Sequence, residues 1–566
     1  MELLKTIKDP KFWLSFRDKK ENQIFLDKLK KEYEETCIGE IETSKFSKFI
    51  LFKDTGDRGV YQETFFKRQH RMYTMAMLCM IYPENEEYLK LLQDTIWEVC
   101  DLYVWALPAH IKNSWDEDKA NSAILDLDAT TMAQSLAIIK VVLGNRLRPL
   151  IVSRIDNEID RRIVKPFLEG EWYWENLYNN WTEVCSGAVG VTFMLNRPEL
   201  FDKIKDRINA NMEKYLSSYK DDGVCVEGPG YWSYGFSAFV EYADMLRDFT
   251  DGKEDFFKNK KIKEIGKFFQ KLYLDKDVIL TYGDCGMDIP VSRGLIYKLK
   301  SIYGDEIELP PQSRLEFGPH GFMVALSAIA LNREEYVKDT PCKNAEYYMA
   351  DSGIYVKKTA KYGFGIKGGT NAESHNHNDV GSFIVAKNNK QVIIDMGGRP
   401  YTRQYFDTNV RYTYVETSSR GHNVPIINGL YQVNTLNPDS TTTFENGVFS
   451  VRYENAYQIK GLSRLQRDVK ADSDGIDITN SFDFDGKVTF VDRLVSFDEP
   501  KIVGNTISIG EVTIVFDPAV SKASYSSEEH TVSVNVDGSV NETKTVYLTN
   551  IELTADVNTL SYRINA

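Results

Sequence analysis

The sequence feature that most constrains the fold is a change of hydrophobic periodicity near residue 338. Before this point apolar residues recur every three or four positions, the spacing of helices that bury one face. After it, apolar and polar residues alternate between Gly, Asn and Asp turns, a pattern typical of antiparallel strands. With 566 residues, 42% of them hydrophobic, the chain can fill two large cores. We therefore predict a helical domain over residues 1–337 and a β-rich domain over residues 338–566.

The helical half is predicted to form a toroid or solenoid of helical hairpins. Asp, Asn and Pro-Glu precede several of its periodic segments, as helix-capping residues do. Many helices of similar length joined by short loops favour helical hairpins, in which each pair buries its apolar face against the next. The expected helices cover residues 65–81, 87–107, 121–143, 147–164, 181–195, 198–219, 235–249, 259–273 and, after a proline-marked connection, 322–331.

The second half is predicted to be an antiparallel β-sandwich. Two of its strands, 383–386 and 391–394, are expected to form a hairpin turned by Asn388 and Asn389. The other expected strands cover residues 353–356, 362–366, 447–452, 489–497, 506–509, 512–516, 532–536 and 544–548.

Composition argues against several classes of protein. The chain has 69 Lys and Arg against 83 Asp and Glu, so it lacks the basic excess that holds phosphate backbones, and we expect neither nucleic acid nor an anionic membrane as a partner. The first 23 residues carry many charges and no apolar core of signal-peptide length, which predicts a cytoplasmic protein without a membrane span. Seven scattered cysteines without CxxC spacing indicate reduced thiols rather than disulfides.

Three of the seven histidines fall close to the predicted hairpin. His377 precedes it, Asp395 ends its second strand and His422 follows in the next loop. These three side chains would meet at one end of a sheet, and two imidazoles with a carboxylate suit Zn²⁺ or another divalent ion such as Mn²⁺. On an extended segment His375 would point the same way as His377 and stay free for proton chemistry. A single histidine beside a strand is usually structural, but this clustering favours a metal or catalytic site.

Two stretches of the helical half add candidates. Asn179 and Asn180 stand among aromatic residues, where amides can hydrogen-bond a sugar or its carboxylate while rings such as Trp181 stack on pyranose faces. Helix capping and core packing are the alternative roles for these residues. Further on, Tyr231 and Tyr234 end a loop held by glycines and a proline. Beside a cation or an imidazolium, a tyrosine hydroxyl can ionise and act as a base.

Taken together, these stretches resemble the heparinase II/III-like family of polysaccharide lyases. The motifs that carry the resemblance are Asn179-Asn180-Trp181, the segment 227–235, the segment 375–383, Asp395 and Gly421-His422-Asn423. The resemblance spans nearly the whole chain, including the order of helical half and β half. It implies an (α/α) toroid followed by antiparallel sheets, an active cleft between them, and cleavage of uronic-acid polysaccharides by β-elimination. Several members of the family carry a metal in the β domain.

The resemblance also implies a role for each candidate residue. It places the metal on His377, Asp395 and His422, and the catalytic groups on Tyr234, His375 and Asn180, with Tyr231 as the substitute for the tyrosine. Glu183, one helical turn after Asn180, is a further catalytic candidate. The substrate-binding candidates are Asn179, Trp181, Tyr231, His110 and Arg411, with Arg399, Arg403 and Arg420 as further members of a sugar-binding rim.

These residue types suit the implied chemistry. The C5 proton of a uronate is barely acidic beside a charged carboxylate, so an amide hydrogen-bonded to that carboxylate would stabilise an enolate-like intermediate. A base then takes the proton and an acid serves the leaving glycosidic oxygen. The predicted protein is thus a carbon–oxygen lyase acting on an anionic, glycosaminoglycan-like oligosaccharide, with a homodimer as a further expectation. Two alternatives are a uronate C5-epimerase using the same site and a carbohydrate-binding protein without turnover.

Overall fold

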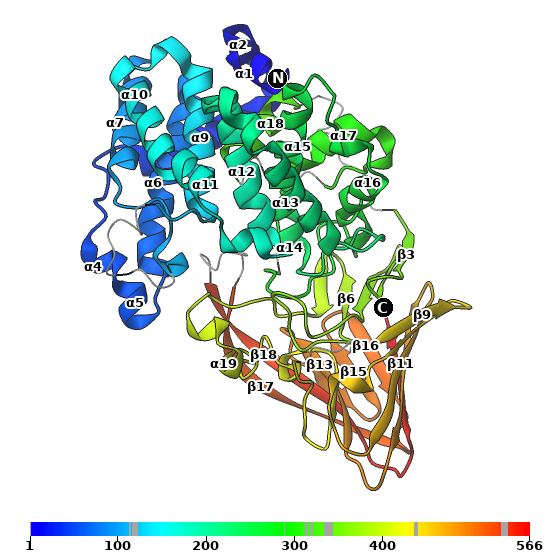
Figure 1. The fold of residues 1–566 in the computed structure, drawn as a ribbon. Coiled ribbons are helices and arrows are strands. Elements are labelled where there is room, and N and C mark those ends of the chain that lie inside the picture. The colour runs from blue at the N-terminus through cyan, green and yellow to red at the C-terminus, as the bar shows by residue number, and fades with distance from the viewer. Residues whose placement is uncertain are drawn as a thin grey trace.

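Helices fill the first part of the chain and antiparallel sheets the second (Figure 1). The computed structural model describes residues 2–111, 115, 123–287, 289–311, 315–316, 321–332, 343–434, 440–533 and 541–566. The predicted fold class, a helical toroid followed by an antiparallel β-sandwich, is confirmed. We call residues 2–332 the helical region and residues 343–566 the β region. The predicted boundary at residue 337 lies outside the described residues, between α18, which ends at Ala330, and β3, which begins at Ala345.

Helix α12 (Asn180–Asn196) lies at the centre of the helical region. It packs against α9 (Leu127–Leu143), α13 (Lys205–Ser218) and α15 (Ser237–Phe249), and almost all of its residues are buried. Gly190 allows the close approach of α15, because a Cβ atom there would lie 2.5 Å from Cε2 of Tyr242. The rigid core around α12 therefore fixes the residues at its first turn, which include Asn180 and Glu183.

The remaining helices surround this core. They are α1 (Glu2–Lys8), α2 (Pro10–Asp18), α3 (Gln23–Glu32), α4 (Phe46–Phe49), α5 (Leu51–Thr55), α6 (Gly59–Ile81), α7 (Glu86–Asp101), α10 (Pro149–Ile159), α11 (Lys165–Glu169), α14 (Pro229–Tyr231), α16 (Lys260–Gly266), α17 (Arg293–Tyr303) and α18 (Phe322–Ala330). The helix predicted over residues 87–107 ends early, at Asp101. The carbonyls of Leu102 and Tyr103 instead accept hydrogen bonds from buried Arg162, which holds this segment as a loop.

One described segment, Leu127–Arg146, is long and apolar enough to cross a membrane by length and composition. The sequence interpretation expected no such run. This segment comprises α9 and the turn after it, and 61% of its apolar 18-residue window is buried inside the molecule. Its apolar character matches its packing against α12.

The described residues of the β region form three antiparallel sheets. The five-stranded sheet runs β3 (Ala345–Met349), β4 (Ile354–Lys358), β5 (Gly363–Lys367), β6 (Phe383–Lys387) and β7 (Lys390–Ile393). The eight-stranded sheet runs β14 (Lys501–Val503), β15 (Thr506–Ile509), β16 (Val512–Phe516), β19 (Thr559–Asn565), β12 (Gly475–Phe484), β11 (Leu462–Ala471), β10 (Val448–Arg452) and β9 (Thr441–Glu445). The four-stranded sheet runs β17 (Ser521–Ser533), β18 (Asn541–Leu553), β13 (Phe490–Ser496) and β8 (Pro425–Ile427).

The predicted hairpin of the five-stranded sheet is present as β6 and β7. Asn388 and Asn389 have φ angles of 49° and 62°, the left-handed conformation that a two-residue hairpin turn requires. In Figure 1 strands β3 and β6 of the five-stranded sheet lie next to the helical region. The loops of this sheet therefore face the helical region.

Candidate active site and metal centre

His377, Asp395 and His422, which we call the metal cluster, are all buried, and their ligand atoms lie within 4.8 Å of one another. His422 Nε2 donates to the carbonyl of Glu416 at 2.9 Å, and His377 Nε2 lies 3.0 Å from Asp284 Oδ1. Since both of these partners are acceptors, the ring proton sits on Nε2 in each histidine and Nδ1 carries the lone pair.

The two Nδ1 atoms fit a metal ion. Nδ1 of His377 is buried without a hydrogen-bond partner, and Nδ1 of His422 lies 3.4 Å from Asp395 Oδ2, so two acceptors face each other. A cation between them would satisfy these atoms, and nitrogen and carboxylate donors suit a borderline ion such as Zn²⁺. The hydrogen bonds on Nε2 are those that commonly orient metal-binding histidines.

Asp284 links His377 of the metal cluster to His375 and Tyr401, and the sequence interpretation missed it. Its carboxylate is fully buried and accepts from five groups: His375 Nδ1 (2.9 Å), His377 Nε2 (3.0 Å), Arg411 Nη2 (2.7 Å), the hydroxyl of Tyr401 (3.2 Å) and the hydroxyl of Tyr405. Burial disfavours the charged carboxylate, but the two histidines and Arg411 outweigh it and hold the pKa of Asp284 well below its usual range. The only sequence signal was an acid between glycines, Gly283-Asp284-Cys285-Gly286.

His375 is positioned by Asp284 and Tyr231. Its Nδ1 donates to Asp284 Oδ2, which leaves Nε2 as the basic nitrogen, and its ring stacks on that of Tyr231 with centroids 4.2 Å apart. The expectation of an extended segment is wrong, because His375 has a φ of 57°. The chain bends there, yet His375 and His377 still reach the same carboxylate.

Tyr231, rather than Tyr234, contacts His375. The Tyr231 hydroxyl lies 3.1 Å from His375 Nδ1 and 2.5 Å from the hydroxyl of Tyr401, a residue that the sequence interpretation missed. Tyr234 instead lies near Asp128 and Glu183 within the helical region. Burial raises the pKa of Tyr231 and of Tyr401 well above 10, so both keep their protons at neutral pH. This placement favours Tyr231, which the sequence interpretation gave as the substitute for Tyr234.

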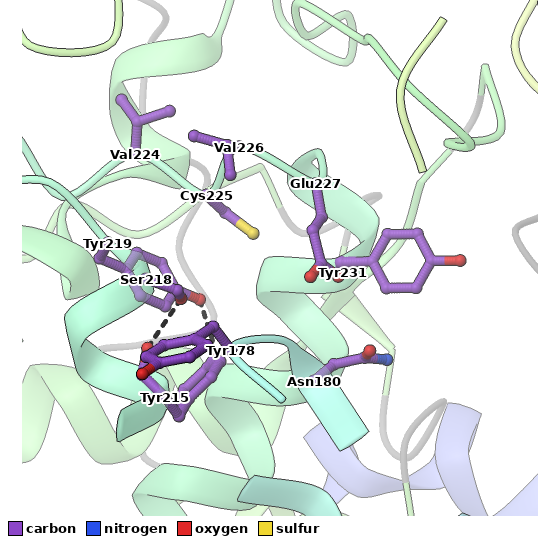
Figure 2. Close-up of a pocket in the computed structure, with 10 residues that line it drawn as sticks. All are labelled: Tyr178, Asn180, Tyr215, Ser218, Tyr219, Val224, Cys225, Val226, Glu227 and Tyr231. Carbon is purple, nitrogen blue, oxygen red and sulfur yellow. Dashed lines mark hydrogen bonds between the residues drawn. The ribbon is translucent and has the colours of Figure 1, made fainter. Parts of the chain in front are cut away.

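A small pocket opens beside Tyr231 (Figure 2). It is lined by Tyr178, Asn180, Tyr215, Ser218, Tyr219, Val224, Cys225, Val226, Glu227 and Tyr231. Asn180 is buried and its Oδ1 has no hydrogen-bond partner, whereas Asn179 caps α12 by accepting from Trp181 N at 3.2 Å.

Glu183 is fully buried in the first turn of α12 and is not among the residues that line the pocket. A Cβ atom on Gly235 would come within 2.2 Å of Glu183 Oε1 and 3.3 Å of Asn180 Cβ. This glycine therefore lets α12 approach the segment 232–236, which follows Tyr231. Complete burial raises the pKa of Glu183 well above its usual value, which keeps the acid protonated. Both carboxyl oxygens lack a hydrogen-bond partner.

His110 and Trp181 lie together next to the first turn of α12. Their ring centroids are 4.7 Å apart, and His110 Nδ1 lies 2.6 Å from Asp126 Oδ2. Asp128 completes a second group of possible metal ligands. However, Asp126 already accepts from His110 and from two backbone amides, so hydrogen bonds within the protein account for its carboxylate.

The predicted arginine rim is not found as such. Arg411 is buried, and its guanidinium is bound to Asp284 and to the carbonyl of Asn376, so it positions Asp284. The other three arginines are engaged in contacts within the protein: Arg399 with Glu416, Arg403 with the carbonyls of Phe52 and Lys53, and Arg420 with Glu528. They were chosen for charge alone, which does not distinguish a structural arginine from an exposed one.

Arg58 is a cation near Tyr401 and Tyr231 that the sequence interpretation missed. It precedes α6 and is half-buried, with its guanidinium carbon 6.0 Å from the ring centroid of Tyr401. Its charged and polar neighbours are Asp128, Tyr401, Tyr231 and Asp126. The helical region therefore places a positive charge near the tyrosines that flank His375.

No family model matches the sequence, and no curated protein matches it. Solved structures do match. The heparan sulfate lyase of Pedobacter heparinus aligns with 90% of this chain and 77% of its own at a TM-score of 0.59 and 12% identity. A heparinase III aligns with 97% of this chain and 84% of its own at a TM-score of 0.60 and 12% identity.

A chondroitin AC lyase of Streptomyces coelicolor, in complex with chondroitin sulphate, aligns with 100% of this chain and 83% of its own. The TM-score is 0.54 and the identity 10%. Together with the order of helical region and antiparallel sheets, these matches show that the chain has the fold of the heparinase III and chondroitin AC polysaccharide lyases.

Proposed function

We propose that this protein is a polysaccharide lyase that cleaves uronic-acid-containing glycans by β-elimination. The observation that carries the proposal is the meeting of His375, Tyr231 and Asp284 beside the pocket that holds Asn180. The matched structures are named as lyases of heparan sulfate and chondroitin, which supports a substrate of the glycosaminoglycan type. Arg58 supplies a local positive charge for such an anion despite the net charge of −14.

His375 is proposed to be the base. With Nδ1–H held by Asp284, its Nε2 accepts the C5 proton as that C–H bond breaks. The electron pair forms the C4=C5 double bond, and the C4–O4 bond breaks. The negative charge of Asp284 stabilises the imidazolium that results.

Tyr231 is proposed to be the acid. It retains its proton at neutral pH and donates it to the departing glycosidic oxygen. The proton that Tyr231 loses and the proton that His375 gains exchange with water after the product leaves, and the Tyr401 hydroxyl, 2.5 Å away, holds the Tyr231 hydroxyl in place. Asn180 is proposed to hold the substrate carboxylate through its amide N–H group as charge moves onto it.

The metal cluster is proposed to hold one zinc-like ion through His377, Asp395 and His422. When bound, that ion would supply a fixed positive charge and tie three loops together. His377 also contacts Asp284, so ligation would keep the Asp284 carboxylate in place for His375. The proton transfers themselves use only His375, Tyr231 and their partners.

The test is ultraviolet absorbance of the unsaturated uronate after incubation with heparan sulfate, chondroitin, hyaluronan or alginate oligosaccharides. We expect Asn180→Ala to raise the activation free energy of turnover by about 3 kcal/mol, as loss of one oxyanion-hole donor does. The matched control Asn179→Ala should cost about 1 kcal/mol of stability through its lost cap and affect turnover less.

A rise in KM alone for Asn180→Ala would reduce Asn180 to a passive binding contact. An epimerised product without new absorbance would contradict the elimination itself.

A further inference from the structure

Glu227 is a buried acid in the pocket that takes no part in the proton transfers proposed for His375 and Tyr231. The residue is 7% exposed, its Oε2 has no hydrogen-bond partner, and it lines the same pocket as Asn180 and Tyr231. In Figure 2 its carboxyl group points to the side of the pocket where Asn180 and Tyr231 lie. An unpartnered buried carboxyl group is costly, so its retention in a binding pocket indicates a ligand group as its partner.

Close backbone packing fixes the position of Glu227 relative to His375. Gly283 has a φ of 66°, and a Cβ atom there would lie 2.9 Å from the carbonyl of His375 and 3.0 Å from that of Glu227. Gly228, at a φ of 115°, packs in the same way against Cys285 and Tyr282. Because these two positions lack a Cβ atom, the loops that carry Glu227, Asp284 and His375 pack backbone against backbone.

The surroundings of Glu227 favour the neutral acid. The groups that face it are His375 and Glu373 from the β region, Asp284 from the adjoining loop, Glu183 from α12, Tyr215 from α13, Cys225 from its own loop and Tyr231 from α14. Within the described residues no lysine or arginine is paired with it. Burial raises its pKa to about 7, and only His375 opposes this shift.

We propose that Glu227 is a further catalytic residue, which binds the substrate uronate as a neutral acid and donates a hydrogen bond to the substrate carboxylate together with Asn180. An ionised Glu227 would repel that carboxylate, whereas the protonated acid stabilises the charge that the carboxylate gains as C5 loses its proton. This role rests on the proposed function, because it presumes a uronate in the pocket.

The proposal predicts proton uptake on binding. At about pH 8, above the pKa of Glu227, a saturated uronate oligosaccharide should bind with uptake of up to one proton per ligand. Calorimetry in two buffers of different ionisation enthalpy measures this number. Glu227→Gln is neutral at every pH and should bind without that uptake, while the control Glu373→Gln, which removes a nearby carboxylate outside the pocket lining, should keep it.

Turnover gives a second readout. Turnover by the wild type should decline above pH 7 as Glu227 ionises. Turnover by Glu227→Gln should stay within about threefold of the wild type at pH 6 and should not show this decline. Turnover by Glu227→Ala should be about a hundredfold lower at every pH. Equal proton uptake in the wild type and Glu227→Gln, or equal loss of activity in the Gln and Ala variants, would overturn the proposal. So would failure of every tested uronate oligosaccharide to bind. Binding with the expected uptake but without unsaturated product would count only against the lyase function.

Discussion

At the scale of single residues, the choice between Tyr231 and Tyr234 decides the site. The two lie three positions apart, yet only Tyr231 contacts both His375 and Tyr401. Tyr231→Phe removes one oxygen, so we expect turnover to fall about a hundredfold or more with little change in melting temperature. Tyr234→Phe is the matched control and should cost much less. A larger loss in Tyr234→Phe, measured as initial rates of absorbance, would return the role to Tyr234.

Glu227 also affects stability. Its pKa of about 7 exceeds the ordinary 4.5, so the folded chain keeps a proton that the unfolded chain releases, and stability falls as pH rises between these values. Glu227→Gln has no ionisable group at this position, so its stability does not fall with pH in this way. It should therefore gain up to about 3 kcal/mol relative to the wild type at pH 8 and almost nothing at pH 4.5. Melting temperatures of both proteins at the two pH values test this, and a gain independent of pH would contradict it.

At the scale of elements, the hairpin β6–β7 and the loops beside it carry the metal cluster. His377 precedes β6, Asp395 follows β7 and His422 precedes β8, so one ion would link three segments. His422→Ala should lose the metal found by elemental analysis and lower the melting temperature, and a chelator should do the same to the wild type. His530→Ala, in β17 and paired with Glu528, is the control. Full stability of the metal-free protein would argue against a structural ion.

At the scale of the whole molecule, the two regions meet around the site. Asp222 in the helical region accepts from the backbone and hydroxyl of Ser352, and Arg403 in the β region donates to the carbonyls of Phe52 and Lys53. These contacts hold Arg58 near Tyr401, although the two residues lie in different regions of the chain. The site is therefore complete only when both regions are docked.

A variant of Arg58 therefore tests whether the docked regions bind the substrate together. Arg58→Ala should raise KM for an anionic oligosaccharide about tenfold at low salt and less at high salt, with a smaller effect on kcat. The control is Arg452→Ala, an exposed arginine of β10 paired with Glu454. Steady-state rates at two ionic strengths provide the comparison, and unchanged KM would place Arg58 outside the binding site.

The sequence by itself determined the fold class, the hairpin and the grouping of His377, Asp395 and His422, because periodicity, turn residues and chain proximity are local properties. It also identified His375, Asn180 and both tyrosines as candidates. Only the tertiary structure revealed Asp284, Tyr401, Glu227 and Arg58 as members of the site. Asp284 lies 91 residues from His375, and glycines that permit close backbone contact bring them together. Burial then sets which acids keep their protons, and burial depends on packing between segments that no local pattern encodes.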